Sequence, residues 1–263
     1  MTGRIALFGG VYSNHVALRA ALEDAGSRGA DTIYCLGDLG AFGPCPDKTI
    51  ALLRESGVRV MRGNYDDSIG RGLDDCQCGY TDPRDNHFAR ISYRYTFEKT
   101  SPENRRWLAE LPPSFRFELG GKKVLLCHGS PRRMNEFLFE STTPTHLLAK
   151  LCRDFDCDVL AGTHTGLPWT RDLPEDRLFV NVGVLGRPQN DGTTDVWYAL
   201  LSADTGGHGV TSELVPLRYD HEELAREMES ERLPDEFVET IRSGYWTTCL
   251  EVLPMKERRR GRY

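Results

Sequence analysis

The sequence predicts an α/β fold built around a largely parallel sheet with helices on its faces. Residues 4–66 alternate strand, helix, strand, helix and strand, an order typical of parallel sheets. Each of these three strands ends in a loop that carries glycine and a polar side chain. Runs over 178–182, 195–202 and 213–219 look like strands of a second sheet.

We place the individual helices and strands by the spacing of their apolar residues and by the glycine or proline residues at their ends. In the first part of the chain, we expect strands over 4–8, 32–36 and 58–61 and helices over 15–25 and 48–55, with Asp47 as the cap of the latter. Residues 67–90 are polar and irregular, and a loop of that length is usually functional or mobile. The later predicted elements are helices over 89–111 (interrupted at 101–103), 143–155, 221–232 and 235–242, and strands over 114–119, 122–127 and 157–161.

The length of the chain, 263 residues, suffices for one large α/β domain or two small ones. No internal repeat, low-complexity segment or linker divides it. We therefore expect a single domain over 1–263, with 67–115 as a lid or insert region and 220–263 as a C-terminal helical tail.

The composition is that of an ordinary soluble globular protein, with 39% hydrophobic and 27% charged residues. A net charge of −6 argues against a nucleic-acid partner, and we interpret the basic tail at 256–262 as a solvated terminus. No apolar run approaches the roughly 20 residues that a membrane span needs, and the N-terminus has no secretory pattern. We therefore expect a cytoplasmic protein with no membrane partner.

Four metal-competent residues each follow an apolar strand, namely Asp38, Asn64, His128 and His164. Ligands of open α/β sheets gather at the carboxyl ends of strands. One carboxylate, one amide oxygen and two imidazoles suit a divalent ion such as manganese, iron or zinc. A single such residue has an ordinary structural explanation, but four at equivalent strand ends favour a metal site.

These same residues carry a resemblance to a known family. Gly37-Asp38, Gly63-Asn64, His128-Gly129 and the motif around His164 resemble the calcineurin-like metallophosphoesterases in order and spacing over residues 4–190. The closer resemblance is to a small bacterial and archaeal branch of phosphodiesterase-like or diadenosine-tetraphosphatase-like proteins. It implies a two-sheet β sandwich flanked by helices and metal-dependent hydrolysis of phosphate esters.

The chain departs from the family pattern at three positions. The first motif, Asp-x-His-Gly-Asn, becomes residues 10–14 here, with Gly10 in place of aspartate and Tyr12 in place of histidine. In the last motif, Gly166 stands in place of the second histidine. The resemblance assigns all three positions to the first of two metals, and the four strand-end residues to the second. We therefore expect one ion per chain (manganese, iron, zinc, nickel or magnesium) or a rebuilt first site.

Further roles are assigned to residues around this centre. Tyr12 and Arg132 are the candidate catalytic residues, because a phenol can donate a proton and a guanidinium can replace lost positive charge. Asn14, Arg62 and Tyr65 are the candidate substrate-binding residues.

Eight cysteines are scattered along the chain, and most are interpreted as small buried apolar residues. Cys76 and Cys78, with His87, offer a soft metal site, although the C-x-C spacing is not that of a zinc knuckle and packing in a lid explains it more simply. By the resemblance, residues 76–87 lie over the site and set the substrate.

Two functions remain open from the sequence. One is a metal-dependent hydrolase of a phosphate mono- or diester that acts on a small phosphorylated or nucleotide substrate. The other is a catalytically degenerate relative that binds a nucleotide or phosphorylated ligand without turnover. Hydrolysis of a non-phosphate ester by the same centre is a third reading. The oligomeric state is left open, a homo-oligomer included.

Overall fold

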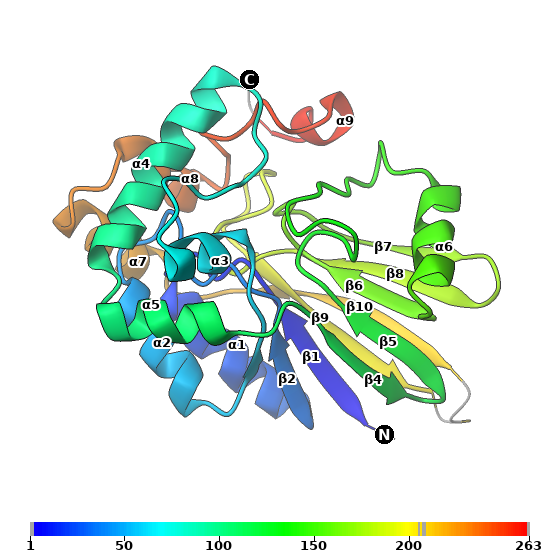
Figure 1. Ribbon diagram of the computed structural model, residues 1–263. Helices are drawn as coiled ribbons and strands as arrows, with labels where there is room; N and C mark the ends of the chain where they lie inside the picture. Colours follow the sequence, from blue (N-terminus) through cyan, green and yellow to red (C-terminus); the bar gives the residue numbers. More distant parts are fainter. Residues whose placement is uncertain (1–2, 205, 207–208, 262–263) are drawn as a thin grey trace.

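Two five-stranded mixed sheets form the centre of the protein (Figure 1). The computed structural model describes residues 3–204, 206 and 209–261. The first sheet has the order β10-β9-β1-β2-β3, and the second has the order β4-β5-β6-β8-β7. The strands are β1 (Arg4–Phe8), β2 (Thr32–Cys35), β3 (Arg59–Val60), β4 (Phe115–Leu119), β5 (Lys122–Leu126), β6 (Val159–Gly162), β7 (Pro168–Leu173), β8 (Arg177–Val182), β9 (Val196–Ala203) and β10 (Val210–Leu217).

Both faces of the first sheet are buried, and its side chains point alternately to one face and to the other. In β1, Ile5 and Leu7 pack with residues of the second sheet such as Leu126 and Val180. Ala6 and Phe8 point the other way and pack with helix residues in a separate core cluster. Successive residues of a strand face opposite sides of its sheet, so this register creates one core between the sheets and one beneath the helices.

Helices flank the outer faces of both sheets, and α6 lies against the second sheet in Figure 1. The helices are α1 (His15–Ser27), α2 (Pro46–Glu55), α3 (Asn64–Arg71), α4 (Pro83–Lys99), α5 (Pro102–Glu110), α6 (Thr145–Asp154), α7 (His221–Ser230), α8 (Asp235–Ser243) and α9 (Met255–Arg258). The predicted α/β architecture with two sheets and flanking helices is confirmed. No helix in the described ranges is both long and apolar enough to span a bilayer.

The assignment of the late strands to a second sheet was wrong for two of three. Only β8 lies in the second sheet, where it pairs with β6 and β7. β9 runs antiparallel to β1, with Ala6 opposite Leu200, and β10 pairs with β9. The chain thus returns to the first sheet after completing the second. An apolar strand carries no signal for which sheet edge it joins.

Residues 67–90 are more regular than the sequence predicted. Most of α3 and the first half of α4 fall in this range, leaving a connection over 72–82. Asp82 is the N-cap of α4, and its side chain accepts a hydrogen bond from the Arg84 amide. Pro83 occupies the first helical position. This is a standard start signal that the polar composition concealed.

The predicted helix cap at Asp47 needs correction. Asp47 does not cap α2, which begins at Pro46 with Cys45 as its N-cap. Its carboxylate instead accepts hydrogen bonds from the Ser101 amide and the Asn104 side chain at the start of α5. Ser101 is the N-cap of α5, at the predicted interruption of the helix.

The described part of the basic tail is anchored at one residue, Glu257, while Lys256, Arg259 and Arg260 are exposed to solvent as predicted. The buried Glu257 of α9 accepts a hydrogen bond from the Ser141 amide at 2.8 Å. Arg260 lies 3.2 Å from the Glu140 carboxylate. The final residue of the predicted solvated segment, Arg262, lies outside the described residues.

Candidate metal centre

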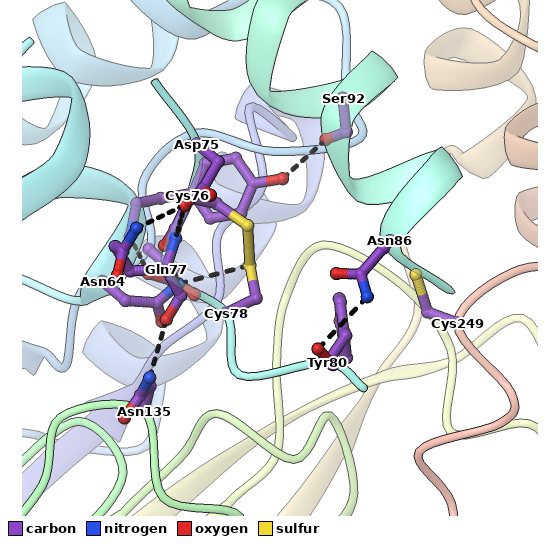
Figure 2. The surroundings of a disulfide bond; sticks show 12 residues. Asn64, Asp75, Cys76, Gln77, Cys78, Tyr80, Asn86, Ser92, Asn135 and Cys249 are labelled. Atoms are coloured by element: carbon purple, nitrogen blue, oxygen red, sulfur yellow. Dashed lines mark hydrogen bonds between the residues drawn. A yellow bond between two sulfur atoms is a disulfide. The ribbon is translucent and has the colours of Figure 1, made fainter. Parts of the chain in front are cut away.

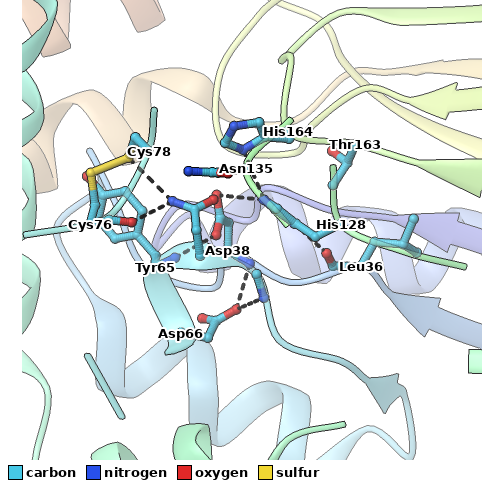
Figure 3. A network of polar contacts seen from close by, with 12 residues as sticks. Leu36, Asp38, Tyr65, Asp66, Cys76, Cys78, His128, Asn135, Thr163 and His164 are labelled. Atoms are coloured by element: carbon cyan, nitrogen blue, oxygen red, sulfur yellow. Dashed lines mark hydrogen bonds and ion pairs between the residues drawn. A yellow bond between two sulfur atoms is a disulfide. The ribbon is translucent and has the colours of Figure 1, made fainter. Parts of the chain in front are cut away.

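The centre lies where the loops after β2, β3, β5 and β6 meet (Figure 3). Asp38 follows β2 and adopts a positive φ of 55°, and His164 follows β6 with a φ of 69°. The Asp38, His128 and His164 side chains each bring one ligand atom to within 4.8 Å of the others, and all three are buried. The structure therefore brings together three of the four predicted ligands through donor atoms of the kinds a divalent ion uses.

The loops after β2 and β3 are in very close contact. A Cβ atom at Gly63 would lie 2.3 Å from Oδ1 of Asp38 and 2.7 Å from the ring of His128. Only glycine therefore fits between the two side chains. The Tyr65 amide, two residues further on, donates a hydrogen bond of 3.0 Å to the same Oδ1.

The Asp66 carboxylate links these two loops through hydrogen bonds. Its carboxylate accepts hydrogen bonds from the amides of Asp38 (2.7 Å), Leu39 (3.0 Å) and Gly63 (2.8 Å). Burial, with the nearby Asp38 charge, raises the pKa of Asp66 to about 7. Sequence reasoning missed this residue, although an acidic side chain three residues after the N-cap of a helix is a recognisable signal.

The hydrogen bonds of His128 fix the protonation of its ring. Nδ1 lies 2.7 Å from the Leu36 carbonyl oxygen, which can only accept, so Nδ1 carries a proton. In the neutral ring, Nε2 then presents a lone pair. That nitrogen lies 3.2 Å from Oδ2 of Asp38 and 3.2 Å from Nδ1 of His164 (Figure 3). Lone pairs of at least two of these side chains therefore face each other. They repel each other unless a proton or a cation lies between them.

The spacing of these atoms fits a shared ion. Nitrogen and oxygen ligands at roughly 2.1 Å from one ion are separated by about 3.0–3.4 Å for angles between about 90° and 110°. Both contacts of Nε2 fall in that range. The donor set therefore fits a divalent metal.

Asn64 has a buried side-chain oxygen that its hydrogen bonds leave free. Its Nδ2 donates to the Cys76 carbonyl oxygen at 2.8 Å and contacts the Cys78 sulfur at 3.4 Å. Its Oδ1 is buried and has no hydrogen-bond partner within the described ranges. A buried carbonyl oxygen without a partner is costly, and an ion would satisfy it.

The electrostatics of the cluster favour the ligand forms of Asp38 and His164 and make His128 easier to protonate. Burial opposes ionisation of Asp38, but attraction to His128 outweighs it, so the pKa of Asp38 is lowered. Burial, with repulsion by His128, lowers the pKa of His164 to about 3, so that ring is neutral. Burial also disfavours the charge on His128, yet the Asp38 carboxylate overcomes it and raises the pKa of His128.

Residues 76–80 run past Asn64 (Figure 2), and Cys76 and Cys78 lie on one side of the centre (Figure 3). Cys76 and Cys78 are joined by a disulfide, and the Gln77 carbonyl between them accepts a hydrogen bond from Asn135 at 2.9 Å. From the opposite loop, the Phe137 ring stacks on His164 with centroids 4.3 Å apart.

The predicted soft metal site of Cys76, Cys78 and His87 does not form in this structure. The two sulfur atoms are bonded to each other, and His87 is exposed beside a groove that Asp74, Arg90 and Tyr93 also line. His87 begins the second turn of α4, a helix that the sequence reasoning did not extend so far.

The resemblance places ligands of a first metal at Gly10, Tyr12 and Gly166, and neighbouring side chains occupy the space beside the two glycines. A Cβ atom at Gly10 would lie 2.3 Å from Val184 and 3.0 Å from the Tyr12 ring. One at Gly166 would lie 2.8 Å from Trp246 and 3.4 Å from a terminal nitrogen of Arg187. Neither an aspartate nor a histidine could therefore be accommodated there without repacking.

Arg187 is a second residue that sequence reasoning missed. It is 5% exposed, and its guanidinium carbon lies 3.4 Å above the Trp246 ring. Its Nε has no hydrogen-bond partner within the described part of the chain. Its charge lowers the pKa of Tyr12, against the larger effect of burial, which raises it. A buried guanidinium nitrogen without a hydrogen-bond partner is a candidate contact for an anionic ligand.

The remaining candidate residues have partners within the fold. The Asn14 side chain caps α1, because its Oδ1 accepts a hydrogen bond from the Ala17 amide. Its Nδ2 donates to the Leu185 carbonyl, so both ends of the side-chain amide have partners. The Tyr65 hydroxyl turns away from the centre to Ser92. Candidate arginines are paired with acidic side chains, Arg62 with Asp67 at 3.4 Å and Arg132 with Glu136 at 2.8 Å.

A model of the calcineurin-like phosphoesterase superfamily domain matches residues 4–206, most of the chain. The chain belongs to the calcineurin-like phosphoesterase superfamily. This is a family of metal-dependent phosphoesterases that typically bind divalent metals, in agreement with the buried cluster of Asp38, His128 and His164.

Related proteins cover nearly the whole chain. An uncharacterized protein of Methanocaldococcus jannaschii is 25% identical over 247 residues, which is 88% of this chain and 94% of its own. The crystal structure of a metallophosphoesterase from Sphaerobacter thermophilus aligns with a TM-score of 0.69 and 24% identity, over 93% of this chain and 100% of that one. A hypothetical protein from Pyrococcus horikoshii aligns with a TM-score of 0.75 and 22% identity, over 94% and 100% of the two chains. These structures share the fold.

Proposed function

We propose that this protein hydrolyses a phosphate mono- or diester with a single divalent ion held by Asp38, Asn64, His128 and His164. The observation that carries the proposal is the approach of Asp38 Oδ2 and His164 Nδ1 to the same nitrogen of His128, at 3.2 Å each. The unpartnered Oδ1 of Asn64 supplies a fourth donor. The family resemblance further supports a place in the small phosphodiesterase-like or diadenosine-tetraphosphatase-like branch.

A divalent ion bound there would polarise a phosphoryl oxygen and make water a better nucleophile. The protein's own contribution is to keep the donors in place. The Leu36 carbonyl holds the His128 tautomer, and the Tyr65 amide holds the Asp38 carboxylate. The Cys76 carbonyl holds the Asn64 amide so that its oxygen stays free.

A one-ion centre needs positive charge on the side where the second ion is lost, and we assign it to Arg187. The guanidinium lies against Gly166 and influences the Tyr12 phenol, at the positions that the family uses for its first metal. Such a cation can bind an equatorial phosphoryl oxygen of the substrate. Because burial raises the pKa of Tyr12, the phenol stays protonated and can donate a hydrogen bond or a proton. Arg132 remains the alternative cation.

The test is hydrolysis of aryl phosphate mono- and diesters by protein loaded in turn with each divalent ion. The proposal predicts turnover with at least one ion, which binds once per chain among Asp38, Asn64, His128 and His164. It also predicts that Asp38→Ala loses this ion and about 100-fold or more of the turnover. Fully loaded protein that hydrolyses neither ester class with any ion would contradict it.

A specific observation also favours the alternative without turnover. Asp38, Asn64, His128 and His164 are 3%, 3%, 2% and 7% exposed, and Phe137 covers His164. A ligand must displace part of the covering segments before it reaches the ion. If loaded protein binds inorganic phosphate or a nucleotide tightly but releases no product from either ester, the binding function holds instead.

A further inference from the structure

A second cluster of metal-competent side chains lies outside the centre described above. It joins His15 at the start of α1, Cys45 before α2 and Glu227 in α7. One ligand atom from each lies within 4.8 Å of the others. The cluster shares no residue with the family motifs, and the proposed function does not use it.

His15 is the side chain that requires explanation. It is 0% exposed, and neither Nδ1 nor Nε2 has a hydrogen-bond partner within the described part of the chain. Burying an imidazole without partners costs free energy that the fold would not ordinarily tolerate. Its Nδ1 faces Oε2 of Glu227 at 3.5 Å, too far for the well-aligned hydrogen bond that would satisfy it.

The distances match a shared tetrahedral ion. Nitrogen and oxygen ligands of tetrahedral zinc lie about 3.3–3.4 Å apart, and sulfur and oxygen ligands about 3.5–3.6 Å apart. Here Nδ1 of His15 is 3.5 Å, and Sγ of Cys45 is 3.6 Å, from the same carboxylate oxygen. Imidazole, thiolate and carboxylate are the three ligand types that zinc sites combine.

The charges are compatible with a cation at this place. Lys48 lies 3.3 Å from Oε1 of Glu227, which leaves Oε2 for the cluster. A thiolate and a carboxylate oxygen would together balance a divalent ion. Cys45 and Glu227 are both partly exposed, so an ion can reach the cluster and solvent can complete its coordination.

We propose that His15, Cys45 and Glu227 bind a thiophilic divalent ion of the zinc class. The ion would add a link between α7, the start of α1 and the residue before α2, beside the Lys48–Glu227 ion pair. Because a structural ion binds the folded chain alone, it adds to stability. This proposal stands independently of phosphoester hydrolysis.

Cobalt(II) titration of the metal-free, full-length protein tests it, because only a thiolate ligand gives the near-ultraviolet sulfur-to-cobalt charge-transfer band. The Asp38→Ala variant removes the contribution of the other centre, whose ligands contain no sulfur. In that background we expect one cobalt ion per chain with the thiolate band, and displacement of the cobalt by zinc.

Three variants identify the ligands in that background. Cys45→Ser should abolish the band, and Glu227→Gln should weaken cobalt binding by about tenfold or more. The Cys76→Ser/Cys78→Ser control should leave the band unchanged. Circular dichroism without metal checks that each variant is folded, and zinc should raise the thermal midpoint of the Asp38→Ala protein but not that of its Cys45→Ser derivative. A folded protein without the band, or a band that survives Cys45→Ser, would overturn the assignment.

Discussion

Nε2 of His128 and Oδ2 of Asp38 lie 3.2 Å apart, with the two side chains 1% and 4% exposed. The Leu36 carbonyl holds the proton of the neutral ring on the other nitrogen, so this contact is satisfied only by an added proton or a cation. The same pair therefore determines both the metal affinity of the centre and its response to pH.

Protons should compete with the ion for His128. Its pKa is raised because the Asp38 carboxylate outweighs the opposing effect of burial. Metal affinity should therefore increase as the pH rises through that pKa, and fall by about tenfold per pH unit below it. Titrations of the Asp38 centre with manganese at a series of pH values measure this, and an affinity that does not change with pH would contradict it.

Without metal, the stability of the fold should decrease as the pH rises, whereas the metal affinity should increase. A raised pKa in the folded state means that His128 stabilises the fold at pH values below its unfolded pKa, about 6.5, and loses this contribution as the pH rises through the folded pKa. Urea unfolding in a chelator should show this decline above about pH 6.5. In Asp38→Asn, which lacks the carboxylate that raises the pKa, the decline should shrink.

Asp66→Asn should destabilise the protein and weaken metal binding. Three amides donate to the carboxylate, and an amide side chain would turn its own N–H₂ toward at least one of them. We expect a loss of about 1–3 kcal/mol in the free energy of unfolding. The matched control is Asp67→Asn, whose partly exposed pairs with Arg62 and Arg71 should contribute less than about 1 kcal/mol. Equal losses for both variants in urea unfolding would refute the role of Asp66.

Restoring the missing histidine should not restore a second ion. Gly166 has a φ of +77°, and its Cβ position is 2.8 Å from Trp246. Gly166→His should lose about 2 kcal/mol or more and bind no additional metal. Gly72→Ala is the control for backbone strain, because Gly72 has a φ of +66° and open space around it. It should cost only about 1 kcal/mol. A stable Gly166→His protein with one more ion than wild type would show that the first site is still available.

Arg187→Met should lower turnover more than it raises KM, because the charge acts on the phosphoryl oxygens as they become more negative. We expect a decrease in kcat of about 10–100-fold, partly recovered in Arg187→Lys. Arg132 is about half exposed and already paired with Glu136, so Arg132→Ala should change kcat by less than about fivefold. The reverse order of effects would assign the catalytic cation to Arg132 instead.

The strand ends were readable from the sequence because local signals define them. Apolar runs that stop at Gly37, Gly63 and before His128 mark strand ends that carry polar side chains, and the structure brings Asp38, His128 and His164 within ligand distance. Strand periodicity predicts each strand end separately. Asp38 follows a strand of the first sheet and the two histidines follow strands of the second, so their meeting also depends on the packing of the two sheets, which periodicity does not encode.

Other features depend on contacts between distant segments that local patterns do not encode. The pairing of β9 with β1 joins residues almost 200 positions apart. The position of Arg187 follows from its stacking on Trp246, a residue outside the matched family region. The cluster of His15, Cys45 and Glu227 likewise requires α7 to return to the start of α1.

Anomalous diffraction from crystals grown with manganese tests the central claim most directly. The account predicts one manganese peak bounded by Asp38, Asn64, His128 and His164, with ligand distances of about 2.0–2.3 Å. A second peak beside Gly10, Tyr12 and Gly166, or no density among the four side chains in metal-saturated crystals, would contradict a centre in which one ion is kept and the other is replaced by protein side chains.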